Sequence, residues 1–101
     1  MSIPVGLSNA CLMPAGVETT FALAAELGYD GVEVMVWSER TTQDSRLLSV
    51  LAERYEQPVL AVHAPTLLLT RGVFGVDPWD KVDRSIELAF ALGAPNVVPH
   101  P

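Results

Sequence analysis

The chain has 101 residues, of which 50% are hydrophobic and 18% are charged, a composition typical of one globular domain and not of a disordered segment. Twelve acidic residues against six basic ones give a net charge of −6, and no basic cluster offsets it, which argues against a nucleic-acid partner. A single cysteine excludes an intrachain disulfide, no apolar run is long enough to span a membrane, and the first residues lack an export signal; we therefore expect a cytoplasmic protein with no membrane partner.

The first quarter of the chain predicts a strand followed by a helix. Residues 3–7 form a short apolar run, and the turn-forming stretch after it contains Ser8, Asn9 and Cys11, the last expected as a small packing residue. A helical stripe begins at Val17, and Gly28 supplies the left-handed residue that ends the helix.

Residues 31–37 predict a strand that is covered on both sides. Successive side chains of a strand point to opposite faces. Alternation therefore places three valines on one face and Glu33, Met35 and Trp37 on the other. Because both faces are mostly apolar, we expect a parallel sheet covered by helices.

Two more helices and two more strands complete the pattern. The second helix is expected to end before Pro58, and its candidate N-caps are Thr41, Thr42, Asp44 and Ser45. Residues 59–63 and 96–100 predict the third and fourth strands. Asp77 is a suitable N-cap for the third helix, which should bury Val82, Ile86, Ala89 and Phe90, with Trp79 packing at its start. The single basic residues, Lys81 among them, are expected on solvated helix faces.

This alternation predicts an α/β fold, a partial (βα)₈ TIM barrel with four parallel strands and three helices. No glycine-rich nucleotide-binding motif follows any strand, which disfavours an open nucleotide-binding sheet. A complete barrel needs about 250 residues. We therefore interpret residues 1–101 as the N-terminal half of a barrel, truncated at its C-terminal end; the alternative is a homo-oligomer in which two copies complete a sheet.

Candidate site residues lie at strand ends, where βα proteins carry their chemistry. His63 ends the third strand and His100 the fourth, so the two imidazoles should meet at one rim, as metal ligands or as partners of a hydroxylated substrate. Glu33 and Trp37 should face the barrel interior, and Asn9 should lie at the same rim. The alternatives are a turn role for Asn9 and, for Glu33, pairing with a basic residue of the missing half.

Several segments together resemble the xylose isomerase-like barrels, which include sugar phosphate isomerases and epimerases and endonuclease IV-like enzymes. The resemblance covers nearly the whole chain and rests on residues 28–34, on 62–65, on 77–79 and on 92–98 with His100 and Pro101. It implies a divalent metal (Mn, Mg, Co or Zn) held mostly by residues beyond this segment. In the endonuclease IV-like branch His63 and His100 would be metal ligands, whereas in the epimerase-like branch they would contact substrate. The chain departs from the family at Pro99, where an aliphatic residue is usual, and a proline there can end the fourth strand early.

The favoured function is that of a metal-dependent sugar or sugar-phosphate isomerase/epimerase that moves a proton next to a carbonyl group. The resemblance places the acid/base pair in the missing half, so we expect this segment to be inactive alone. Substrate-binding residues are predicted to be Asn9, Glu33 and Trp37, and metal ligands His63 and His100. The alternatives are an endonuclease IV-like abasic-site nuclease and a non-catalytic βα fragment that self-associates.

Overall fold

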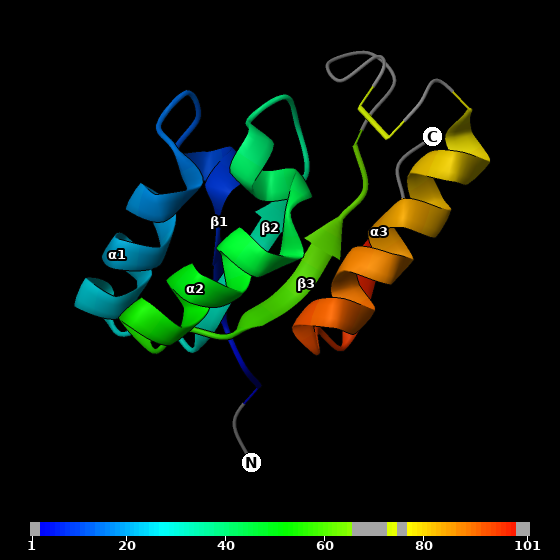
Figure 1. Ribbon diagram of the computed structural model, residues 1–101. Helices are drawn as coiled ribbons and strands as arrows, with labels where there is room; N and C mark the ends of the chain where they lie inside the picture. Colours follow the sequence, from blue (N-terminus) through cyan, green and yellow to red (C-terminus); the bar gives the residue numbers. More distant parts are fainter. Residues whose placement is uncertain (1–2, 66–72, 75–76, 99–101) are drawn as a thin grey trace.

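The computed structural model describes residues 3–65, 73–74 and 77–98 (Figure 1). Strands and helices alternate along the chain. Their order is β1 (Gly6–Ser8), η1 (Asn9–Cys11), α1 (Val17–Leu27), β2 (Gly31–Met35), η2 (Arg40–Gln43), α2 (Ser45–Tyr55), β3 (Val59–His63), α3 (Pro78–Leu92) and β4 (Asn96–Val98). The predicted α/β fold, with four parallel strands and three helices, is confirmed.

Local signals set the helix ends as the sequence predicts. Gly28 and Gly93 end α1 and α3 with φ of 79° and 69°, the left-handed conformation that glycine adopts without a steric penalty. Asp44 and Asp77 cap α2 and α3 by accepting hydrogen bonds from the first free backbone N–H groups. Two strands are shorter than predicted: β1 covers Gly6–Ser8 where residues 3–7 are expected, and β2 ends at Met35, two residues before Trp37, whereas β3 covers the predicted residues.

The sheet has the strand order β1-β2-β3-β4, and every neighbouring pair is parallel. One irregularity interrupts the register: Val32 pairs with Val59, but Glu33 pairs with Ala61, so Leu60 is an extra residue in β3. Gly31 lies at this bulge, where a Cβ atom would overlap the carbonyl oxygen of Pro58. A bulge of one residue reverses which face the following side chains occupy.

One face of the sheet carries all three helices and the hydrophobic core (Figure 1). Val32, Val34 and Val62 point to this face, and α1 contributes Phe21, α2 Leu48 and other apolar residues of the same cluster. The predicted valine face of β2 is therefore confirmed. Consecutive strand order with helices on one face is the arrangement of successive units in a barrel, whereas a doubly wound sheet carries helices on both faces.

The buried face of α3 differs from the prediction. Ala89 is buried, but Ile86 and Phe90 are 50% and 89% exposed, and Trp79 is 77% exposed. The face that packs on the core is rotated around the helix, and its buried residues are Lys81, Ser85, Leu88 and Ala89. The helix has apolar residues on two sides, and contact with the sheet selects between them, which periodicity alone does not reveal. Cys11 was also predicted as a packing residue and is instead exposed.

Candidate functional site

Two predicted site residues, Glu33 of β2 and His63 of β3, meet on the face of the sheet that no helix of the described residues covers. His63 Nε2 lies 3.3 Å from Glu33 Oε1, within hydrogen-bonding distance. The side chains are 24% (His63) and 35% (Glu33) exposed, so both are shielded yet reachable from solvent. The pair can bind a hydroxyl group, offer nitrogen and oxygen donors to a metal, or hold a proton between them.

The bulge in β3 places His63 on this face. Because Leu60 is the extra residue, Ala61 lies opposite Glu33 and His63 opposite Met35, and these four side chains share one face. If the same residues formed a regular strand without the bulge, His63 would share the face of Val59 and point toward the helices and the hydrophobic core. The histidine therefore reaches Glu33 because of a local irregularity in the strand.

Asn9, predicted as a substrate-binding residue, makes two hydrogen bonds to the backbone of β2. Its Oδ1 accepts a hydrogen bond from Met35 N at 2.6 Å, and its Nδ2 donates one to Met35 O at 3.0 Å. The residue is only 1% exposed. The amide thus continues the pairing of the first two strands beyond Ser8 and holds the end of β2 in place.

Trp37 lies just beyond β2, where the η2 segment holds its backbone. Thr42 Oγ1 accepts a hydrogen bond from Trp37 N at 3.2 Å, and Gln43 Nε2 donates one to Trp37 O at 2.9 Å. The indole Nε1 is buried and has no hydrogen-bond partner within the described part of the chain. A buried donor of this kind is unusual in a folded protein and is available to an oxygen atom of a water molecule or ligand.

The second predicted metal ligand, His100, lies outside the described residues. Within residues 3–65, 73–74 and 77–98, no group of three or more His, Cys, Asp or Glu side chains is placed to hold a metal ion. Glu33 and His63 provide two donors of suitable type, fewer than the three or four protein ligands of a typical zinc site.

Sequence reasoning missed a buried lysine. Lys81, expected on a solvated helix face, is 2% exposed, and its Nζ donates a hydrogen bond to Val73 O at 2.6 Å. Burial lowers the pKa of this amine below its ordinary value. The local sequence shows no sign of this burial, because Asp80 and Asp83 beside Lys81 are typical of a solvated helix face, and only the tertiary packing of α3 buries the side chain.

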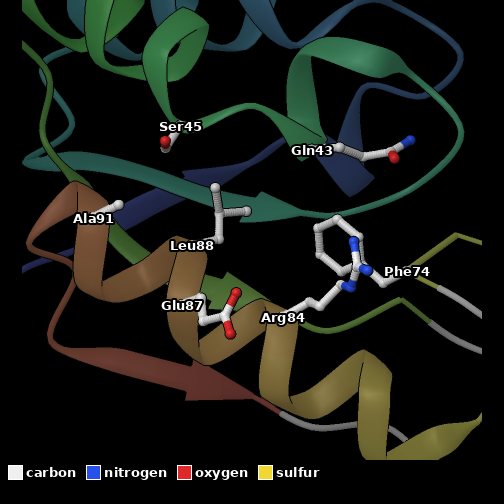
Figure 2. A pocket seen from close by; sticks show the side chains of 7 residues that line it. All are labelled: Gln43, Ser45, Phe74, Arg84, Glu87, Leu88 and Ala91. Atoms are coloured by element: carbon white, nitrogen blue, oxygen red, sulfur yellow. The ribbon is translucent and has the colours of Figure 1, made fainter.

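A separate cleft of about 340 Å³ lies between η2 and the start of α2 on one side and α3 on the other. Figure 2 shows the side chains that line it: Gln43, Ser45, Phe74, Arg84, Glu87, Leu88 and Ala91. Leu88 and Phe74 give the cleft apolar walls, while Arg84 and Glu87 bring opposite charges to it. The cleft lies among the helices, whereas Glu33 and His63 lie on the opposite face of the sheet.

Comparison with curated proteins finds mycobacterial relatives whose names state no function. A protein of Mycobacterium leprae is 50% identical over 99 residues, which cover 98% of this chain and 35% of the relative. Proteins of Mycobacterium bovis and Mycobacterium tuberculosis are 50% identical over 100 residues, 36% of each relative. The chain thus spans about a third of the length of the curated relatives it matches. No protein-family model and no solved structure matches the sequence, and no helix in the described ranges is long and apolar enough to cross a membrane.

Proposed function

We propose that this chain is the N-terminal part of a cytoplasmic, metal-dependent sugar or sugar-phosphate isomerase/epimerase that transfers a proton next to a carbonyl group. The observation that carries the proposal is the Glu33–His63 pair, half-buried on the helix-free face of a consecutively ordered parallel sheet. The proposed reaction belongs to the complete protein, and the 101 residues are inactive alone.

The site suits a polyhydroxylated ligand. Sugars are bound in proteins by side chains that can both donate and accept hydrogen bonds to hydroxyl groups, as a carboxylate and an imidazole together do. The indole N–H of Trp37, which has no hydrogen-bond partner among the described residues, would add a donor near the end of β2, and the indole ring would add an apolar surface. Asn9 supports the pair by fixing the backbone of Met35, which pairs with His63.

His63 is the residue that would contribute to a metal site, with Glu33 beside it; the other ligands must come from outside the described residues. A divalent metal bound there would polarise the carbonyl group of the substrate and so acidify the adjacent C–H bond. Within this chain, Glu33 orients the imidazole through Nε2. Both side chains exclude part of the solvent from the bound hydroxyl groups.

The test uses the complete protein, of about the same length as the mycobacterial relatives. Metal-free protein is mixed with Mn²⁺, Mg²⁺, Co²⁺ or Zn²⁺ and a panel of aldoses, ketoses and their phosphates in D₂O, and NMR follows exchange of the proton next to the carbonyl group. We expect exchange with at least one sugar, a loss of about 100-fold or more in His63→Ala, and a smaller loss in Glu33→Gln, which keeps an acceptor without the charge.

Ser49→Ala, an exposed substitution on α2, is the matched control and should retain full exchange. Absence of exchange with every sugar and metal would contradict the proposal. Metal-dependent cleavage of abasic-site DNA, abolished by His63→Ala, would replace it with the nuclease function.

A further inference from the structure

Four apolar residues of α3 lie on one side of the helix, three of them exposed, and we call this surface the α3 stripe: Trp79, Val82, Ile86 and Phe90. Trp79, Ile86 and Phe90 are 77%, 50% and 89% exposed, and Val82 is half-buried. At about 100° per residue, these four positions fall within one narrow sector of the helix. Large exposed apolar residues that occur singly are common, but three aligned on one side of a helix, with half-buried Val82 on the same side, indicate a contact surface.

The position of the stripe relative to the rest of the fold identifies the direction from which a partner would come. One side of α3 packs on the sheet through Ser85 and Ala89, and a second side, with Arg84 and Ala91, lines the cleft toward α2. The stripe lies on the remaining side, away from α2. Figure 1 shows α3 at the end of the row formed by α1, α2 and α3, so this side has no helix beside it in the described structure.

We propose that the α3 stripe is the docking surface for an amphipathic helix of a further βα unit, which the complete protein supplies from residues outside these 101. In the described fold each helix packs against the helix of the adjacent unit, α1 on α2 and α2 on α3. The curated relatives are nearly three times as long as this chain, which provides material for such a unit. The exposed carboxylates of Asp83 and Glu87 border the stripe, so the docking helix should carry Lys or Arg at the edge of its apolar face. This inference does not depend on the catalytic proposal.

The test compares the same substitutions in the 101-residue chain and in the complete protein. Ile86→Asp introduces a charge into the stripe, and Val50→Asp is its matched control, because Val50 of α2 is also 50% exposed but lies off the stripe. We expect Ile86→Asp to lower the melting temperature of the complete protein by about 5 °C or more while changing that of the 101-residue chain little. Val50→Asp should have the same small effect in both.

A labelling experiment covers the case in which Ile86→Asp prevents folding of the complete protein. Phe90→Cys places a thiol in the stripe, and mass spectrometry of the peptide that contains it measures its alkylation rate. The rate should be about tenfold slower in the complete protein than in the 101-residue chain, whereas Val50→Cys should react equally in both.

Equal alkylation of the stripe thiol in the two proteins would overturn the proposal, as would equal melting-temperature shifts. A concentration-dependent dimer of the complete protein that Ile86→Asp dissociates would also overturn it, because a second copy would then cover the stripe.

Discussion

Replacing Asn9 with alanine should strongly destabilise the fold, although the residue lies in a short turn segment. The substitution removes the side-chain partner of the Met35 N–H and C=O groups, which are part-buried. Each such group costs about 1–3 kcal/mol, and water entering the space left by the amide offsets part of that cost. We therefore expect a loss of about 3 kcal/mol, out of a total of about 5–15 kcal/mol for a domain of this kind.

Urea denaturation measures this loss directly. For a slope of about 1 kcal/mol per molar urea, the midpoint should fall by about 2–3 M in Asn9→Ala, and the Met35 amide should exchange faster with solvent. Ser8→Ala is the control: it removes the exposed bond from Ala10 N to Ser8 Oγ and should cost under about 1 kcal/mol. A loss below about 1 kcal/mol in Asn9→Ala, with unchanged exchange at Met35, would refute the role we assign to the amide.

A second substitution at the same position tests the hydrogen-bond directions. In Asn9→Asp an ionised carboxylate still accepts from Met35 N but opposes Met35 O with a second acceptor, whereas a protonated carboxyl group can donate to that oxygen as the amide does. The stability of Asn9→Asp relative to the parent chain should therefore rise as the pH is lowered from about 7 to about 4. No such change would indicate that Met35 O finds another donor.

Three further predictions concern the bulge, a helix cap and a surface network. Gly31→Ala should cost about 1–3 kcal/mol in urea denaturation, because the added methyl group overlaps the Pro58 carbonyl oxygen; a neutral effect would show that β3 can shift. Glu39→Ala should cost about 1 kcal/mol, since both oxygens of that carboxylate accept the Val17 N–H at 3.0 and 3.1 Å at the start of α1; a stability equal to the parent chain's would exclude this cap. The hydrogen bond between Tyr55 and Glu18 lowers the pKa of Glu18 and raises that of Tyr55. The bond therefore stabilises the fold fully between pH 4.5 and 10.0. Its contribution is lost as the pH falls through the lowered pKa of Glu18 or rises through the raised pKa of Tyr55. Tyr55→Phe should return the pKa of Glu18 toward 4.5 in an NMR titration, and an unchanged Glu18 titration would show that the phenol has no influence.

The sequence predicts those parts of the fold that depend on a few adjacent residues. Glycine after an apolar helical stripe ends α1 and α3, and Asp77 starts α3, because each effect needs only the local backbone. The buried face of α3 could not be predicted in this way. Two apolar stripes fit the same helical period, and packing against the sheet decides which one is buried.

The candidate site is predictable in part for the same reason. Alternation along β2 places Glu33 opposite the valine face, and the end of β3 places His63 near it, so their proximity on the helix-free face agrees with the predicted location. The bulge at Leu60, which places the His63 side chain on the same face of the sheet as Glu33, has no local signature in the sequence. The two bonds of Asn9 also depend on a strand 26 residues away, which no short motif encodes.

The consecutive strand order has a consequence for how such a protein is assembled and modified. Each strand pairs with the strand made immediately before it, so every new βα unit docks on an edge that already exists as the chain leaves the ribosome. Addition or loss of a whole unit at the β4 side changes the number of strands without altering the pairing of β1, β2 and β3. In a doubly wound sheet the strands made first lie in the centre, and later strands are added at both edges. Addition or loss of a unit there would change one edge or the other. The position of Glu33 against His63 is therefore set by three units of chain and is independent of how many units follow.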